Sequence, residues 1–397
     1  MEILGLVGKP NVGKSTLFSA ATLIPVGIAN YPFTTVKPNR GMAFLRARCP
    51  HLDLGKPCAP KNSPCEGGVR LVPMELLDVA GLVPKAHEGR GLGNQFLDDL
   101  RQANALVHVV DASGATDFEG NPVAAGSHDP RDDVRFLEEE IAHWIRGIVL
   151  RGWEKVARQA ELDETPVERL VHARLTGLGM SEAQVKAAIG DSALDPRPTK
   201  WSPEDFLRLA GNLQRRGKPM LIAANKMDAA PPATSALLAG MEGLRVVPCS
   251  GDYELALRRA AKAGLIAYEP GAASFTFTPG DAVTPAQRKA LERIQAYLRE
   301  HGGTGVQRIL EMVARETLRF ITVYPVEDET HWTDKQGNVL PDALLLPQGA
   351  TAQDLAFKVH TDLGKNFIRA IDGRTKRVVG HAHELHEGDV IKIVARA

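Results

Sequence analysis

A glycine-rich run near the start of the chain carries residues that are suited to holding phosphate. Residues 8–15 read GKPNVGKS and match the pattern Gly-x-x-x-x-Gly-Lys-Ser/Thr. In this pattern Gly8 and Gly13 let backbone N–H groups face a β-phosphate, Lys14 reaches the β- and γ-phosphate oxygens, and Ser15 ligates magnesium. The run therefore predicts a phosphate-binding loop. Four neighbours are also expected to contact the nucleotide: Pro10, Asn11, Val12 and Thr16.

A second set of polar residues follows the apolar run VPMELLDVAG. Asp78 is placed to hold magnesium through water, and Gly81 leaves its N–H free to turn toward a γ-phosphate. The next residue is Leu82, at the position where many proteins with this pattern carry a glutamine that orients the attacking water. Between the two signals, residues 28–39 read IANYPFTTVKPN, and we expect the Thr35 hydroxyl to reach magnesium. The alternative for this stretch is a turn that contains proline.

The base-reading residues are predicted from the run PMLIAANKMD, which ends in Asn225, Lys226 and Asp228. A carboxylate at position 228 accepts the N1 and N2 hydrogens of guanine but faces a lone pair of adenine, so the pattern selects guanine. The later run VVPCSG places the backbone of Ser250 and Gly251 where it can meet guanine O6.

The elements that must position these residues are short apolar runs, each followed by a loop. Runs of this kind are typical of buried parallel strands, and a helix start follows the first loop. The chain has 397 residues, 44% of them hydrophobic, which predicts two or three domains. Lys plus Arg and Asp plus Glu each number 48, which excludes a general attraction to polyanions. With no leader and no run of the ~18 apolar residues that a membrane span needs, we expect a cytoplasmic protein without membrane contact. The expected oligomeric state is a monomer.

The stretch of sequence between the Asp-x-x-Gly signal and the base-reading signal predicts a helical insertion. Apolar residues recur at helical spacing from Val134 to Ile148, and hydroxyl residues at 165, 181 and 202 are in place to cap helices. The insertion serves either as a contact for a partner or as a cover for the sheet. The expected nucleotide-binding domain comprises residues 1–130 and 216–280, and the insertion comprises residues 131–215. A helical connector is expected at residues 281–319 and a C-terminal β-rich module at residues 320–397.

Several long blocks resemble the YchF (Obg-like ATPase) subfamily of the Obg-related P-loop GTPases. They are GKPNVGKSTLFSAAT, IANYPFTTVKPN, DVAGLVPKAHEGRGLGNQFLDDLRQANALVHVVDASG, NKMD and LPQGATAQDLAFKVHTDLGKNF. The resemblance implies an α/β fold with a mainly parallel sheet, a helical insertion and a C-terminal β-grasp (TGS) domain. It also implies contact with the ribosome or tRNA through that domain and the insertion. Many members depart from Asn-Lys-x-Asp and prefer ATP, whereas the NKMD of this chain favours GTP.

The resemblance also implies hydrolysis without a glutamine, as Leu82 indicates. Three residues are candidates for completing the site: Asn11, which resembles an asparagine that ligates potassium in related GTPases, His87 and His108. The alternatives are a solvated loop side chain for His87 and a hydrogen-bonded core residue for His108. We therefore expect a magnesium-dependent GTPase switch that hydrolyses slowly. The alternative function is a nucleotide-dependent scaffold for stress or proteostasis partners, and a small-molecule phosphotransferase is disfavoured by NKMD.

Two further clusters in the sequence leave their roles open. Cys49, His51, Cys58 and Cys65 lie within the stretch CPHLDLGKPCAPKNSPC, which can hold zinc or form an irregular surface loop, because it lacks paired Cys-x-x-Cys knuckles. Residues 365–377, KNFIRAIDGRTKR, carry five basic residues, which suit either a phosphate contact or a solvated hairpin.

Overall fold

The computed structural model describes residues 2–23, 39–79, 81, 99–241, 243–280 and 283–396. Thr35, Leu82 and His87 lie outside the described residues. The chain divides into two compact units, one formed by residues 3–20 and 76–309, and one by residues 1–2, 21–75 and 310–397. The sequence did not indicate that residues 21–75 belong to the same compact unit as residues 310–397. The expected domain boundaries stay a prediction.

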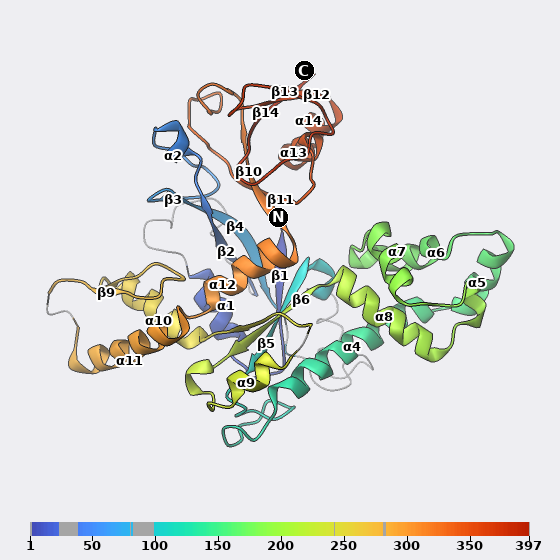
Figure 1. Cartoon of the computed structure of the whole chain (residues 1–397), viewed down its shortest axis with the longest axis horizontal. Helices are drawn as coiled ribbons and strands as arrows, with labels where there is room; N and C mark the ends of the chain where they lie inside the picture. The colour runs from blue at the N-terminus through green and yellow to red at the C-terminus, as the bar shows by residue number, and fades with distance from the viewer. Residues whose placement is uncertain are drawn as a thin grey trace. The chain divides into compact units, whose positions relative to one another are not determined.

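The larger unit contains the strands that the phosphate and base signals follow, including residues 76–78 of the strand that ends at Asp78 (Figure 1). Their order is β4-β1-β5-β6-β7, and β1 with β5, β5 with β6, and β6 with β7 pair in parallel. The bounds are Ile3–Val7 for β1, Val69–Asp78 for β4, Ala105–Asp111 for β5, Met220–Asn225 for β6 and Val246–Pro248 for β7. All seven residues of β5 are buried, as expected for a central parallel strand. The mainly parallel α/β sheet confirms the predicted fold class.

Helices flank this sheet, and two of them begin directly after loops of the site. α1 spans Lys14–Thr22, and α10 spans Gly251–Lys262. Beyond β7 lie the short hairpin of β8 and β9 and two further helices. The bounds of the remaining elements are Thr234–Ala239 for α9, Ile266–Ala267 for β8, Thr276–Phe277 for β9, Pro285–His301 for α11 and Val306–Glu311 for α12.

The segment between β5 and β6 is helical. Its helices are α4 (Pro130–Leu150), α5 (Trp153–Leu162), α6 (Val167–Leu175), α7 (Glu182–Asp191) and α8 (Pro203–Gly217). In Figure 1 they form the green group, in which α4 and α8 pack together. One apolar core runs from strand residues such as Val7 and Leu106 into these helices, so part of the insertion covers the sheet. The buried stripe of α4 ends at Val149, whereas the sequence pattern indicated Ile148.

The predicted caps of the insertion are confirmed at two of three positions. Ser181 and Ser202 each form a capping box, at α7 and α8. The prediction for Thr165 is wrong, because Pro166 occupies the N-cap position of α6 with φ −56° and ψ 131°. This extended ψ places Pro166 before the first helical residue, so a threonine one position earlier is too far away to cap the turn.

The smaller unit combines β2 (Arg40–Arg48), α2 (His51–Leu54), β3 (Cys65–Glu66) and most of β4 with the C-terminal module. The module has a five-stranded sheet in the order β11-β10-β14-β12-β13, and β10 pairs in parallel with β14. This arrangement confirms the β-grasp prediction. The module's elements are β10 (Phe320–Val326), β11 (Leu344–Pro347), α13 (Ala352–Val359), α14 (Thr361–Lys365), β12 (Phe367–Asp372), β13 (Val378–Val379) and β14 (Val390–Ala395). Among the described residues, no helix is both long and apolar enough to cross a bilayer.

Candidate functional site

The loop between β1 and α1 has a backbone that only glycine tolerates at two positions. Gly8 has φ 146°, and a Cβ there would lie 2.4 Å from the carbonyl oxygen of Val109. Gly13 has φ 89°, and a Cβ there would lie 2.4 Å from the side-chain nitrogen of Asn225. Both distances are below any real carbon contact, so the loop and the strands beside it can approach this closely only without side chains at these positions.

Lys14 is one of two buried lysines in this loop, with Lys9. Its Nζ donates to the carbonyl oxygens of Gly8 at 2.9 Å and Lys9 at 2.8 Å, which closes the loop around the ammonium group. Burial lowers the pKa of Lys14, and the charge of Asp78 opposes that shift. A Cβ on Gly81 would lie 3.4 Å from Lys14 Nζ, so the glycine of Asp-x-x-Gly lies against the lysine, and the turn of its N–H toward a γ-phosphate stays a prediction.

Ser15 and Asp78 come together at the start of α1. The Ser15 hydroxyl donates to Asp78 Oδ2 at 2.9 Å. Burial raises the pKa of Asp78, while the hydrogen bond from Ser15 and the charge of Lys14 act in the opposite direction. A hydroxyl and a carboxylate oxygen are hard donors of the kind that magnesium prefers, so this pair fits the predicted metal role.

Asn225, at the end of β6, links the base motif to the phosphate-binding loop. Its Nδ2 donates to the carbonyl oxygen of Val12 at 2.9 Å, and its Oδ1 accepts the N–H of Gly251 at 2.9 Å. The side chain is 2% exposed, so both bonds are shielded from water. Asn225 therefore holds the loop and the start of α10 in place.

Lys226 makes a second link between the same segments. Its Nζ donates to the carbonyl oxygen of Asn11 at 2.7 Å and to Asp111 Oδ2 at 2.8 Å. Asp111 is fully buried at the end of β5. Burial alone would raise its pKa, but hydrogen bonds from Lys226 and Ser113 and the charge of Lys226 outweigh burial and lower it. The carboxyl ends of β1, β5 and β6 are thus joined by side chains, at the edge of a parallel sheet where ligands bind.

Several of these residues line one cleft of about 340 Å³. Lys14 and Asp228 both line it, so the predicted phosphate and base contacts share a single space. Asp252, in the first turn of α10, also lines the cleft and was not found from the sequence; its position just after the capping Ser250 was the available signal. The full lining is Asn11, Gly13, Lys14, Ser15, Thr16, Asn225, Lys226, Asp228 and Asp252.

Ser250 and Gly251 are held by bonds within the chain. The N–H of Ser250 donates to the carbonyl oxygen of Thr304 at 2.9 Å, and that of Gly251 donates to Asn225. The Ser250 hydroxyl caps α10 by accepting from Tyr253 N. Neither residue belongs to the lining of the cleft, so their contact with guanine stays a prediction.

Two of the catalytic candidates lie in described regions, and their surroundings differ. Asn11 lines the cleft with φ 61°, and its Nδ2 donates to the carbonyl oxygen of Gly120 at 3.0 Å. His108 is 1% exposed within β5, and burial, with the charges of Lys14 and Lys9 as smaller causes, lowers its pKa to about 3. His108 is therefore neutral near pH 7 and does not line the cleft. It is a core residue, but its Nδ1 has no hydrogen-bond partner among the described residues, so the hydrogen-bonded alternative is met in burial alone and the catalytic role stays a prediction.

Comparison with known proteins gives matches along nearly the whole chain. Residues 3–147 match the family of 50S ribosome-binding GTPases, residues 223–328 the G4 motif-containing domain of YGR210-like Obg-like GTPases, and residues 333–395 the TGS domain. An uncharacterized GTP-binding protein of Methanocaldococcus jannaschii is 49% identical, with all of both chains covered. The solved GTP-binding protein of Pyrococcus horikoshii OT3 is 42% identical, with a TM-score of 0.79 and all of both chains covered. The ribosome-binding ATPase YchF of Escherichia coli O157:H7 is 29% identical over 92% of this chain and 86% of its own.

Proposed function

Because the chain belongs to the YchF-related Obg-like P-loop GTPases and carries a TGS domain, we propose that it is a switch that binds GTP, hydrolyses it slowly with magnesium and acts at the ribosome. The observation that carries the proposal is the shared cleft of Lys14 and Asp228. One ligand in that cleft contacts both a phosphate-binding cation and a carboxylate. A guanine nucleotide has the matching groups at its two ends.

Guanine selection is assigned to Asp228. Asn225 already uses its amide nitrogen on Val12 and its amide oxygen on Gly251, so its role is to position the loops. Asp228 is half-buried in the short turn of Met227–Ala229, directly beside the cleft. Its carboxylate accepts two hydrogens from guanine, whereas adenine would leave it poorly paired.

Magnesium is assigned to Ser15 and Asp78, with Thr35 as a further ligand when the γ-phosphate is present. The metal would neutralise charge on the β- and γ-phosphates, and Lys14 would reach the same oxygens. In the absence of a glutamine, we assign a potassium ion to Asn11. Since Nδ2 of Asn11 donates to Gly120, Oδ1 is the side-chain atom suited to bind a cation.

Ribosome contact is assigned to the smaller unit. An open cleft of about 570 Å³, here called the arginine cleft, is lined by five arginines together with Phe320 and Glu387. Three of these arginines form ion pairs, Arg48 and Arg374 with Asp53 and Arg315 with Glu387. Arginine side chains bind RNA phosphates and stack on bases. The chain as a whole has no net charge, so we assign RNA contact to this local cluster. The arginines are Arg46, Arg48, Arg315, Arg319 and Arg374.

The decisive measurement is the affinity for GTP and for ATP, with the unmodified chain and with Asp228→Glu. We expect tighter binding of GTP, and a loss of roughly tenfold or more of that preference in the variant, because hydrogen bonds to a charged group contribute about 1.5–3 kcal/mol. Asp252→Glu, in the same cleft, is the matched control and should keep the preference for GTP. Equal affinity for both purines in the unmodified chain would contradict the proposal.

A second measurement separates the switch from a scaffold with incidental hydrolysis. Single-turnover hydrolysis of GTP is followed with and without ribosomes. A switch of this class is slow alone, at about 10⁻⁴ to 10⁻³ s⁻¹, and is accelerated by its partner. An identical rate in both conditions would favour the scaffold.

A further inference from the structure

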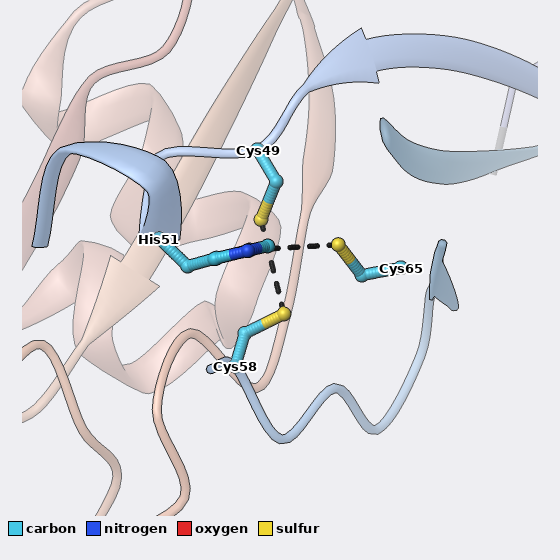
Figure 2. Close-up of side chains that lie close together, drawn as sticks. All are labelled: Cys49, His51, Cys58 and Cys65. Atoms are coloured by element: carbon cyan, nitrogen blue, oxygen red, sulfur yellow. Dashed lines mark hydrogen bonds between the residues drawn. The ribbon is translucent and has the colours of Figure 1, made fainter. Parts of the chain in front are cut away.

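Four soft metal ligands converge in the smaller unit, in a place that nucleotide binding does not use. Cys49, His51, Cys58 and Cys65 direct three sulfur atoms and one imidazole nitrogen toward a common centre (Figure 2). All four ligand atoms lie within 4.8 Å of one another. The tertiary structure thus brings together residues for which the sequence left both zinc and an irregular loop open.

The distances between these atoms match the edges of a tetrahedral zinc site. With Zn–S near 2.3 Å and Zn–N near 2.0–2.1 Å, ideal geometry puts two sulfurs about 3.8 Å apart and a sulfur and a nitrogen about 3.6 Å apart. The Cys49 and Cys58 sulfurs are 3.9 Å apart, and the Cys65 sulfur is 3.5 Å from His51 Nδ1. A disulfide needs about 2.05 Å between sulfurs, and all four cysteines of the chain are free thiols.

Short structural elements hold each ligand in this position. Cys49 follows the last residue of β2, is fully buried, and donates its N–H to the carbonyl oxygen of Gly68 at 2.8 Å. His51 begins α2, a single turn that ends at Leu54 and is capped by Gly55 with φ 68°. Cys65 lies in β3, which pairs with β4. The ligands are therefore carried on two strand ends and a capped turn, with Cys58 on the connecting loop, and they need no rearrangement to meet.

The charge around the cluster suits thiolates. Three thiolates and a neutral imidazole around Zn²⁺ carry a net charge of −1. Arg70, opposite Cys65 in the β3–β4 register, is fully buried and uses its guanidinium on the carbonyl oxygens of Ser63 at 2.8 Å and Leu340 at 2.5 Å. A buried cation without a carboxylate among these bonds is costly, and an anionic metal centre nearby would offset that cost.

The loop that carries the ligands also binds the C-terminal module. Ala59 N donates to the carbonyl oxygen of Val339 at 2.9 Å, and Lys61 N to that of Pro341 at 2.7 Å. The side chain of Lys61 forms an ion pair with Asp334 at 2.5 Å. Residues 59–62 lie between Cys58 and Cys65, so the conformation of this segment depends on how Cys58 and Cys65 are held at its two ends.

We propose that Cys49, His51, Cys58 and Cys65 form a structural zinc site that holds the loop 49–66 against residues 334–343 of the TGS module. The site is structural because four protein ligands complete the tetrahedron and leave no position for a substrate or water. Soft thiolates with one imidazole select zinc over magnesium or calcium.

The test begins with the metal content of the full-length chain, purified under reducing conditions without added metal. Elemental analysis should find one zinc per chain, and Cys58→Ser and Cys65→Ser should lower this to background. Cys249→Ser is the matched control: Cys249 is a buried thiol outside the cluster, and its loss should leave the zinc in place. Cobalt added to the zinc-free chain should give the thiolate charge-transfer bands of a tetrahedral site.

Two readouts keep the test informative if a variant folds poorly. In the unmodified chain, removal of zinc by a chelator should expose three further reactive thiols and speed hydrogen exchange at Ala59 and Lys61, while the affinity for GTP stays unchanged. The proposal is overturned if the unmodified chain binds neither zinc nor cobalt, or if Cys249→Ser loses as much zinc as the cluster variants. Equal reactivity of the thiols with and without zinc would also overturn it.

Discussion

Asn225 donates a hydrogen bond at 2.9 Å to the carbonyl oxygen of Val12, which lies 213 positions earlier in the chain. The same side chain accepts the N–H of Gly251, at the start of α10. The phosphate-binding loop and the two loops on the base side are therefore joined by hydrogen bonds through one side chain. A disturbance at any of the three should reach the other two.

We expect Asn225→Ala to weaken both folding and nucleotide binding. The change leaves Val12 O and Gly251 N without partners in a buried place, which should cost roughly 2–4 kcal/mol, and it should lower the affinity for GTP at least tenfold. Denaturant unfolding and nucleotide titration check this. Asn212→Ala is the control, because Asn212 is also buried and hydrogen-bonded, to Ser192 Oγ at 2.7 Å, but lies in the insertion. It should destabilise the fold and leave the affinity alone, and a similar loss of affinity there would contradict the assignment.

Potassium should accelerate hydrolysis through Asn11. The rate with potassium should exceed the rate with sodium at equal ionic strength, and Asn11→Gly should remove the difference. Glycine is the suitable replacement because it tolerates the φ of 61° and so preserves the loop. Binding of GTP should change little. If sodium supports the same turnover as potassium in the unmodified chain, the role assigned to Asn11 fails.

His108 should make the fold sensitive to acid. Its pKa is about 3 in the folded chain and about 6.5 when unfolded. Between these values the unfolded chain binds a proton that the folded chain does not, so stability falls as pH drops below about 6.5, by up to about 1.4 kcal/mol per pH unit. His108→Leu should lack this contribution, as unfolding measured from pH 7 to pH 4 would show.

The same variant tests the catalytic alternative for His108. A neutral core histidine predicts that His108→Leu keeps the turnover number at pH 7 when the fold is intact. A large drop in turnover with unchanged nucleotide affinity and stability would instead support a catalytic role.

The arginine cleft should carry contact with RNA. Replacing Arg46 and Arg319 by alanine should weaken ribosome binding several-fold and reduce its dependence on salt, because fewer phosphates would be neutralised. The control is Lys365→Ala with Arg369→Ala, two exposed basic residues of the 365–377 stretch outside the cleft. If both double variants lost ribosome affinity equally, RNA contact could not be assigned to the arginine cleft alone and would include residues 365–377. Within that stretch, Arg374 lines the cleft and pairs with Asp53, so the stretch does not act as one basic face.

Much of the site could be predicted because its signals are local. The geometry of GKPNVGKS follows from two glycines and a helix start, so Lys14 and Ser15 could be placed from eight residues. The capping boxes at Ser181 and Ser202 need only four residues each. The prediction for Thr165 was wrong because the backbone of Pro166 is extended, so Pro166 takes the N-cap position and the threonine lies one residue too early. Asp252 was missed since its carboxylate reaches the cleft only after α10 is oriented by bonds to Asn225 and Thr304.

By itself the sequence predicted the chemistry that we propose for this protein: a phosphate-binding loop, a carboxylate assigned to guanine and the order along the chain of the strands that carry them. Each of these depends on residues within one turn or one strand, where backbone preferences act alone. Only the tertiary structure decided which distant groups meet. Lys226 pairs with Asp111, Asn225 joins Val12 to Gly251, and three cysteines and a histidine converge beside Arg70. These contacts depend on parallel strand pairing and on packing of the whole core, which set distances between residues that no local pattern can specify.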